Sequence, residues 1–563
     1  MSKETLKVGH VIEVRGASIV GELEATVDDL YRTHKSRKYT IGQVGSVIKI
    51  ESGDTLVFGV VTSLRMVEED GSASGLISSA KWLEIDILGQ GSRTGFGETQ
   101  FIFERGISTY PLPGQAIYLA TIDELHRIYA KPDKPTIQVG RVSQARGLPV
   151  HLLIDELLGR HFAVLGTTGS GKSCAVALLL QSILTQYEYG HIILLDPHNE
   201  YPAAFPSKAI FTDPTKLKLP YWLLNFEESV SLFVGSTEHT ATSQTNILKN
   251  AILYARRSFP ENKLKQYSIT VDTPVPYDID DVIKHIEENT PSQASKQDSY
   301  LKILAKIKTL QDDKRFDFMI VPEAKDDLAD IISSFLRIPV KKKPLNIIDL
   351  SGVPSDVLDV VISVLCRMVF DFSLWNPNRN QMPLLLICEE AHRYIPKSED
   401  VAFKNSRAAL ARIAKEGRKY GVGLALISQR PSELSESVLS QCNTIVALRM
   451  SNEQDQNYVK RALPENVKSL VDALPALRTK EAIVVGEGAT VPVRLLFDDL
   501  PKDRMPRSAD ILEFLKHLRT VFLKELSALS IHWIHLRWRF LKLLVDGLQN
   551  HGELAAAAGT HSL

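Results

Sequence analysis

The sequence predicts an α/β fold in which a parallel β-sheet carries helices on both faces, with a small β-barrel before it and a helical insertion within it. Three observations predict this arrangement. Short apolar runs separated by turn residues fill the first 145 residues, and strand-like and helical patterns alternate over 146–500. A complete phosphate-binding loop at 166–173 joins a strand-like run to a helical one.

Residues 1–145 are expected to form the β-barrel, with a structural or assembly role. Glycines and a Pro-Leu-Pro-Gly cluster separate several short apolar runs, a pattern typical of small barrels and sandwiches. This region contains no catalytic constellation. The strand candidates are 8–14, 43–51, 55–66, 82–88, 100–103 and 115–120.

Residues 146–500 are expected to form the α/β domain. Within it, the β pattern stops over 215–340 and amphipathic helical patterns replace it, which predicts the insertion. Residues 501–563 predict a basic helical tail that packs on its own domain or on a neighbouring subunit, with a membrane-surface helix as the alternative. The strand candidates of the α/β domain are 163–166, 192–196, 345–350, 384–388, 422–428 and 444–449.

Composition limits the possible partners and the compartment. The chain has 563 residues and a net charge of −1, so nucleic acid would have to bind a local basic surface, such as loops around a pore. The four cysteines lack metal-ligand spacing, which favours free thiols in a reducing compartment. The polar start and the charges within 526–545 predict neither a signal peptide nor a membrane span. We therefore expect a cytoplasmic protein without a membrane partner.

The strongest motif is the phosphate loop, which matches G-x-x-x-x-G-K-[ST] at every position. Glycines let main-chain N–H groups face phosphate oxygens, Lys172 brings a positive charge to the β- and γ-phosphates, and the Ser173 hydroxyl can ligate Mg²⁺. The helix after the loop adds a partial positive charge at its N-terminus. We therefore expect ATP and Mg²⁺ as ligands. The predicted nucleotide-binding residues are Gly166, Thr167, Thr168, Gly169, Ser170, Gly171, Lys172, Ser173 and Cys174.

An apolar run at 384–388 ends in two adjacent acids, Glu389 and Glu390. A run without polar residues is typical of a central parallel strand, and crowded carboxylates at its end need a cation to balance them. We assign Glu389 to the magnesium shell and Glu390 to activation of the attacking water. Another apolar strand, 422–428, ends before Gln429, which would lie beside the γ-phosphate as a sensor.

The separation of these motifs indicates a class of P-loop nucleoside triphosphatase. More than 200 residues divide Lys172 from Glu390, and the strand candidate 192–196 lies between them in the sequence. An extra strand in the sheet and a glutamate beside the metal acid favour the RecA-like motor branch, with an additional strand and a catalytic glutamate. Small kinases and GTPases are disfavoured.

Four segments resemble the HerA family, and the resemblance spans about residues 5–500. Asn199 departs from the family pattern Asp-Pro-His-Gly-Glu-Tyr, but Asn tolerates left-handed backbone, so we expect the turn to survive. The lead-in at 150–160 and the β-rich start are also similar to the family. The four segments are 196–201 (DPHNEY), 389–396 (EEAHRYIP), 412–421 (RIAKEGRKYG) and 428–431 (SQRP).

The resemblance implies a homo-hexameric ring with ATP bound between subunits and double-stranded DNA moving through a central pore. It also implies a partner, usually the nuclease NurA. In some bacterial anti-phage systems the partner is another effector, such as a sirtuin-type NAD hydrolase. The role could therefore lie in DNA end processing or in anti-phage defence.

An arginine from a neighbouring subunit can stabilise the charge that spreads over the γ-phosphoryl oxygens in the transition state. Arg418 is our first candidate because it lies between the acid strand and the sensor strand, and Arg412 and Arg160 are the others. The alternative is that each arginine pairs with a local acid such as Glu416.

Two functions stay open at the level of sequence. In the first, an ATP-driven DNA translocase or helicase, pore contacts to DNA phosphates would come from basic residues after the acid strand, although these could equally be an ordinary solvated stretch. In the second, an ATP-dependent oligomeric scaffold assembles and regulates a partner effector. The near-neutral charge and the basic tail are compatible with the second. The candidate pore residues are Arg393, Lys397, Lys404 and Arg407.

Overall fold

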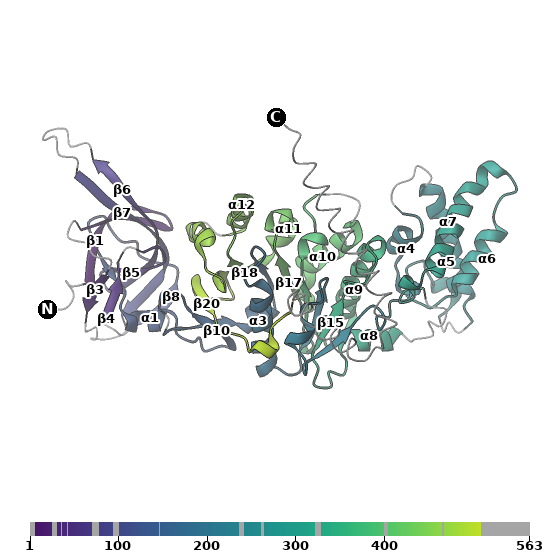
Figure 1. Cartoon of the computed structure of the whole chain (residues 1–563), viewed down its shortest axis with the longest axis horizontal. Helices are drawn as coiled ribbons and strands as arrows, with labels where there is room; N and C mark the ends of the chain where they lie inside the picture. The colour runs from purple at the N-terminus through teal and green to yellow at the C-terminus, as the bar shows by residue number, and fades with distance from the viewer. Residues whose placement is uncertain are drawn as a thin grey trace, which may run out of the picture. The chain divides into compact units, whose positions relative to one another are not determined.

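The structure is a computed structural model (Figure 1). It describes residues 6–507 apart from 25–30, 35–36, 42, 70–77, 94–100, 146, 236–240, 261–263, 321–327, 399–402 and 464–466. The predicted helical tail therefore lies outside the described residues from position 508 onward. Among the helices of the described ranges, none combines the length and apolar character that a membrane span requires.

The N-terminal region is a closed antiparallel barrel with strand order β2-β1-β9-β5-β6-β7, and β2 pairs with β7 to close it. Alternate residues such as Ile48, Ile50, Val57 and Val61 point inward and form its core. β8 (Phe101–Arg105) extends the sheet beside β7, and β3 (Tyr31–His34) pairs with β4 (Arg37–Thr40). The barrel strands are β1 (Lys7–Arg15), β2 (Ser18–Leu23), β5 (Val47–Ser52), β6 (Thr55–Glu69), β7 (Ser78–Arg93) and β9 (Ala116–Leu119).

A second sheet of eleven strands has the order β11-β10-β20-β19-β18-β12-β17-β16-β13-β15-β14. The strands from β18 to β14 run parallel, and β19, β20, β10 and β11 add antiparallel pairs at one side. The parallel strands are β12 (His161–Leu165), β13 (His191–Asp196), β14 (Ala209–Thr212), β15 (Leu345–Asp349), β16 (Leu384–Cys388), β17 (Val422–Ser428) and β18 (Cys442–Leu448). The antiparallel strands are β10 (Thr136–Val142), β11 (Pro149–Leu153), β19 (Glu481–Gly486) and β20 (Val493–Phe497).

Two features of this sheet differ from the expectations. β10 lies within the 1–145 stretch expected to form the barrel, but it pairs with β11 and β20 of the second sheet, so strand pairing ends the barrel before Thr136. In the sequence, helix α1 (Ile122–Ile128) lies between the barrel strands and β10, and a capping box of Thr121 and Glu124 marks its N-terminus. The strand between β12 and β16 is β17, whereas the candidate 192–196 became β13, on the far side of β16.

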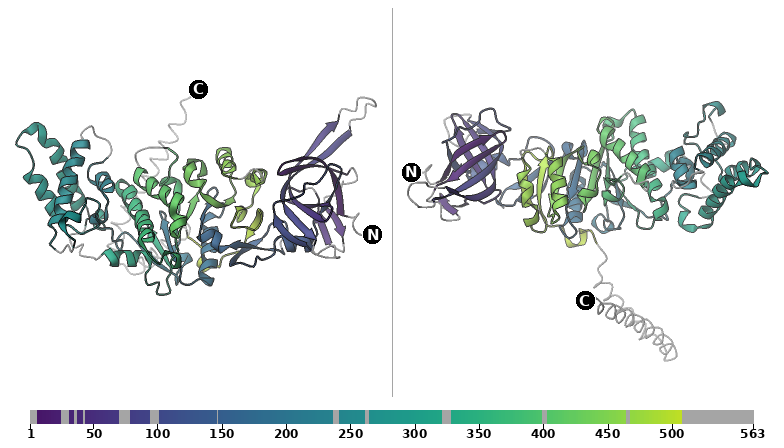
Figure 2. Two further views of the ribbon diagram at one scale, coloured as in Figure 1. Left: turned by 180° about the vertical axis from the view of Figure 1, so that it is seen from behind. Right: turned by 90° about the horizontal axis from the view of Figure 1, so that it is seen from above.

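Helices cover both faces of the parallel strands, as the fold class requires (Figure 2). Successive β12 residues point to opposite faces. Phe162 and Val164 belong to one apolar core with helix α3 (Lys172–Gln186). Ala163 and Leu165 belong to another core with α9 (Ser355–Trp375) and α10 (Lys404–Glu416). Burial on both faces explains why these strands are continuously apolar in the sequence.

The described residues between β14 and β15 form five α-helices and their connections, so the predicted α/β fold with a barrel and a helical insertion is confirmed. Glu228 on α4 accepts hydrogen bonds from Arg367 and Ser363 on α9, both at 2.8 Å, and fastens the insertion to the α/β core. The insertion helices are α4 (Phe226–Phe233), α5 (Ala241–Ser258), α6 (Ile279–Glu288), α7 (Ala294–Asp312) and α8 (Leu328–Leu336). The other helices of the α/β domain are α2 (Ile154–Leu158), α11 (Glu436–Leu439) and α12 (Glu453–Ala462).

A buried acid fastens the antiparallel side of the sheet. Glu481, at the start of β19, is 0% exposed and accepts hydrogen bonds from Arg494 at 3.0 Å and Arg478 at 3.3 Å, and also from Ser143. Burial acts to raise the pKa of Glu481, but these hydrogen bonds outweigh it and lower the pKa to about 2. Ser143 follows β10, so Glu481 links β10 to the β19–β20 hairpin.

We expect Glu481→Gln to lower the free energy of unfolding at pH 7 by about 3 kcal/mol, because the two arginines lose a buried partner. The ionised glutamate stabilises the fold above its ordinary pKa of 4.5, and this contribution disappears as the pH falls toward the folded value of about 2. The difference between parent and variant in urea unfolding should therefore shrink below about pH 4.5. Asp498→Asn, at a half-exposed acid, is the control and should change little. Equal stability of the Glu481→Gln variant and the parent at pH 7 would contradict this interpretation.

Candidate nucleotide site

The carboxyl ends of the parallel strands bring the phosphate loop, Gln429 and the two acids together. β12, β17 and β16 are adjacent and parallel, so their carboxyl ends lie together. The phosphate loop follows β12, Gln429 follows β17, and Glu389 and Glu390 follow β16. Three motifs that lie far apart in the sequence therefore converge on one point.

The loop has the backbone geometry that phosphate binding requires. Gly169 and Gly171 have φ values of 75° and 100°, which residues with a side chain rarely adopt. A Cβ atom on Gly166 would lie 2.8 Å from the Ser170 Oγ atom, so the close approach requires glycine. No side chain caps the N-terminus of α3, and the fully buried Ser170 hydroxyl has no hydrogen-bond partner among the described residues. The main-chain N–H groups of the first turn of α3 are thus available to a phosphate, and the site fits a nucleotide.

Neighbouring strand ends hold the loop in place. The main-chain N–H and the hydroxyl of Thr167 both donate to the carbonyl of Arg449 at 3.0 Å, and Gly166 N donates to Ser428 O at 3.2 Å. The Thr168 hydroxyl donates to the side-chain oxygen of Gln429. Gln429 therefore contacts the loop directly, where a sensor of the γ-phosphate would have to lie.

The two acids are buried beside Lys172. Lys172, Glu389 and Glu390 are 7%, 3% and 6% exposed. Burial and the charge of Glu390 raise the pKa of Glu389, and burial also raises the pKa of Glu390, while the charge of Lys172 acts in the opposite direction on both. One lysine cannot balance both carboxylates, and a magnesium ion held by Ser173 and Glu389 would complete the balance.

The turn after β13 adds residues to which the sequence assigned no role. The Ser173 hydroxyl donates to Glu200 Oε2 at 2.8 Å, and the Tyr201 hydroxyl donates to Glu389 Oε2 at 3.0 Å. The Asp196 carboxylate accepts from the N–H groups of His198 and Tyr201 and shapes the turn. Asn199 adopts the expected left-handed conformation, with φ 56°. In the sequence, the segment 196–201 contributes only to the family resemblance.

His392 is a further residue that sequence reasoning missed. Its Nδ1 atom lies 3.3 Å from Glu390 Oε2 and 3.2 Å from the Ser428 hydroxyl. Burial lowers the pKa of His392 to about 4, so the imidazole is neutral at pH 7. It therefore lies beside Glu390 without neutralising it, and its hydrogen bond is to the Ser428 hydroxyl. Glu390 itself has φ 50°, a left-handed conformation that turns the chain directly after the strand.

The three candidate arginines lie apart from these residues. Arg160 and Arg418 precede β12 and β17, so they lie at the opposite edge of the sheet from the phosphate loop. Arg160 pairs with Glu156 at 2.8 Å and also with Glu487. Arg412 lies 4.3 Å from the centre of the Phe370 ring and pairs with Asp371 and Glu416. A catalytic role for Arg160 or Arg418 therefore requires a neighbouring subunit.

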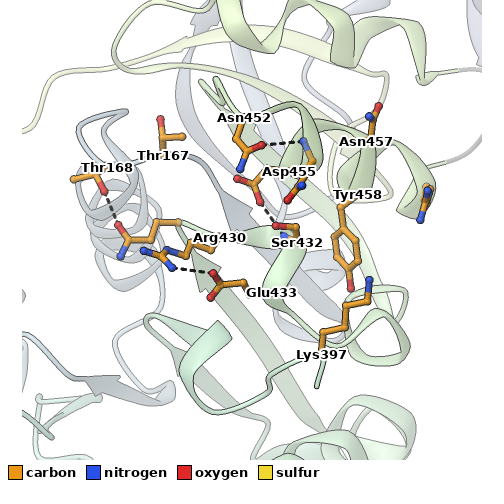
Figure 3. Close-up of a pocket in the computed structure, with 13 residues that line it drawn as sticks. Thr167, Thr168, Lys397, Arg430, Ser432, Glu433, Asn452, Asp455, Asn457 and Tyr458 are labelled. Carbon is orange, nitrogen blue, oxygen red and sulfur yellow. Dashed lines mark hydrogen bonds and ion pairs between the residues drawn. The ribbon is translucent and has the colours of Figure 1, made fainter. Parts of the chain in front are cut away.

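A polar groove of about 910 Å³ adjoins the phosphate loop (Figure 3). Arg430 donates to Glu433 at 2.8 Å, and the Lys397 ammonium lies 5.7 Å from the centre of the Tyr458 ring. Lys397 is the candidate pore residue that lines the groove, whereas Arg393, Lys404 and Arg407 do not line it. The lining residues are Thr167, Thr168, Lys397, Gln429, Arg430, Ser432, Glu433, Asn452, Gln454, Asp455, Asn457, Tyr458 and Arg461.

Comparison with known proteins gives the family context. A DNA double-strand break repair helicase HerA of Pyrococcus furiosus is 29% identical over 411 residues, which cover 67% of this chain and 72% of that protein. The protein of the same name from Sulfurisphaera tokodaii is 29% identical over 69% of this chain and 74% of its own length. The structure of VirB4 of Thermoanaerobacter pseudethanolicus aligns with a TM-score of 0.48 and 16% identity, over 66% of this chain and 98% of that one.

The family model described as the central domain of the helicase HerA matches residues 137–369. This segment contains the phosphate loop, and it also contains the lead-in at 150–160 and the turn at 196–201, which are similar to the family in sequence. With the two relatives, the match confirms that the chain is similar to the HerA family.

Proposed function

We propose that this chain is the ATPase subunit of a ring-shaped, ATP-driven translocase or helicase that acts on double-stranded DNA. The observation that carries the proposal is the convergence of Lys172, Glu390 and Gln429 at the ends of three adjacent parallel strands. The relatives' names support it, since both are DNA double-strand break repair helicases.

Each group at the site has a defined task in hydrolysis. The loop amides and Lys172 bind the phosphates, and Glu390 accepts the proton of the attacking water. Gln429 contacts the γ-phosphate and links it through the loop to the strand β17. Magnesium held by Ser173 and Glu389, with Glu200 next to Ser173, would neutralise phosphate charge when bound.

In a ring, a neighbouring subunit would supply the arginine that a single subunit does not place at its own phosphate loop. Because Arg160 and Arg418 lie at the far edge of their own sheet, either could act only on the nucleotide of a neighbour, and Arg418 remains our first candidate. We propose a homo-hexamer with duplex DNA in the central pore, and Lys397 as a contact between the groove and the DNA backbone. Its partner would be a NurA-like nuclease or another effector such as a sirtuin-type NAD hydrolase, in DNA end processing or anti-phage defence.

A second candidate is an ATP-dependent scaffold that assembles and regulates such an effector. The observation in its favour is the net charge of −1, which gives the whole chain no electrostatic attraction to DNA. In this case ATP would set the oligomeric state and DNA would not alter hydrolysis.

Two substitutions separate nucleotide binding from hydrolysis. Lys172→Ala should abolish binding of ATP, because the phosphates lose their buried cation. Glu390→Gln should keep binding and lower kcat by about 100-fold or more, because the water loses its base. Steady-state phosphate release and equilibrium binding of ATP measure the two effects. Glu188→Gln, at an exposed acid paired with Lys208, is the control and should hydrolyse ATP at the parent rate. Hydrolysis at the parent rate by Glu390→Gln would remove Glu390 from the mechanism.

Duplex DNA should raise the ATPase rate of the parent chain several-fold, and about 200 mM salt should suppress this stimulation because the contacts are to phosphates. Lys397→Ala should weaken the apparent DNA affinity. It should also reduce the slope of log affinity against log salt concentration by about one, as expected for loss of one phosphate contact. Lys265→Ala, on the insertion, is the control. If duplex DNA leaves the ATPase rate unchanged at every salt concentration, the translocase function is rejected and the scaffold function is favoured.

Mixed rings test whether the site is shared between subunits. Arg418→Ala and Lys172→Ala chains should each be inactive alone and should regain part of the ATPase rate when mixed. The reason is that an intact loop can then meet an intact arginine across an interface. The rate is measured across mixing ratios at constant total protein. If every ratio stays at the level of the single variants, Arg418 does not act across the interface.

A further inference from the structure

A second lysine lies against the phosphate loop. Lys480 immediately precedes β19, and its main-chain N–H donates to the carbonyl of Ser170 at 3.2 Å. A Cβ atom on Gly171 would lie 3.5 Å from Lys480 N and 3.8 Å from Lys480 Cγ. Lys480 holds a left-handed conformation with φ 68°, which directs the chain past the loop. The lysine is therefore built into the loop's surroundings.

The sheet order defines which end of the nucleotide lies near Lys480. β12 lies between β17 and β18, and the γ-phosphate residues Gln429 and Glu390 follow β17 and β16 on one side. Lys480 lies immediately before β19, which pairs with β18 on the other side. A triphosphate that presents its γ end to Gln429 must direct its α-phosphate and nucleoside toward β18 and β19. Lys480 thus lies on the side of the α-phosphate.

The side chain of Lys480 begins beside the start of helix α3. Gly171, whose added Cβ atom would lie 3.8 Å from Lys480 Cγ, is the N-cap of this helix. Cys174 is the second residue after Lys172, in the first turn of α3, where main-chain N–H groups face the phosphates nearest the nucleoside. The Lys480 side chain thus begins beside the helix start at which an α-phosphate would bind.

The present partner of the Lys480 ammonium is easily exchanged. It pairs with Asp499, whose side chain is 81% exposed. An ion pair on an exposed carboxylate is weak because water and salt screen it. A phosphate oxygen held by the loop would offer the ammonium a partner already fixed in place.

We propose that Lys480 is a nucleotide-binding residue that contacts the α-phosphate, exchanging Asp499 for a phosphate oxygen. The proposal rests on nucleotide binding at the loop and adds to it a cation from the C-terminal hairpin. Because ATP and ADP share the α-phosphate, Lys480 stabilises both nucleotides equally. Its contribution therefore differs from that of Gln429, which depends on the γ-phosphate.

The test measures equilibrium binding of ADP and of a non-hydrolysable ATP analogue to the full chain. Lys480→Ala should weaken both by the same factor, roughly tenfold, as expected for loss of one charge-assisted contact. Lys480→Arg keeps the charge and should restore most of the affinity. Lys502→Ala, at another exposed lysine near the C-terminal end of the domain, should bind like the parent. Thermal unfolding without nucleotide identifies any variant that is misfolded, and Lys480→Arg then decides the question.

Three results would overturn the proposal. Unchanged affinity of Lys480→Ala for both nucleotides would exclude the contact. A loss confined to the ATP analogue would move the contact to the γ-phosphate, and failure of Lys480→Arg to restore binding would exclude the charge as the cause. Absence of ADP binding by the parent would instead overturn the proposed function, and it would be seen before any variant is compared.

Discussion

Two adjacent carboxylates buried beside a single lysine impose a charge balance on which the rest of the site depends. Glu389 and Glu390 end a central strand, are almost inaccessible to water, and share the charge of Lys172. Burial of unpaired carboxylates is costly, so the arrangement is stable only if the acids take up protons or a cation joins them. A magnesium–nucleotide complex supplies that cation together with the phosphates that the loop is shaped to bind. The electrostatics of the acids and the backbone geometry of the loop therefore fit the same ligand.

The order of the strands gives the site two different sides. β17 and β16 bring Gln429 and Glu390 to one side of the phosphate loop, while β18 and β19 bring Lys480 to the other. A nucleotide bound as proposed would have its two ends recognised by different parts of the chain. On the γ side, Gln429 also lines the polar groove that contains Lys397. Loss of the γ-phosphate would, in the proposed mechanism, be transmitted to this groove through the Gln429 side chain.

Much of the fold and the chemical centre could be predicted because the signals are local. The loop at 166–173 is one contiguous motif, and the apolar runs before Glu389 and Gln429 mark buried parallel strands whose ends must meet. The left-handed backbone at Asn199 was predicted from the resemblance, because the family pattern has glycine at this position and Asn tolerates the same conformation.

Residues whose position depends on tertiary structure escaped prediction. Glu200 meets Ser173 only because the turn after β13 folds back, and His392 meets Ser428 only because β16 and β17 are neighbours. Lys480 is 308 residues from Lys172 in sequence and reaches the loop through antiparallel strands at the side of the sheet. The position of β17 between β12 and β16 and the membership of β10 in the second sheet have the same cause, since apolar runs do not specify strand order.

The most direct measurement is a crystal structure of the full chain with a non-hydrolysable ATP analogue and Mn²⁺, with anomalous scattering used to locate the metal. The account predicts phosphates against the loop amides and a single metal peak between the Ser173 hydroxyl and the Glu389 carboxylate, with a water facing Glu390. Phosphates bound away from the loop, or a metal peak remote from Ser173 and Glu389, would contradict it.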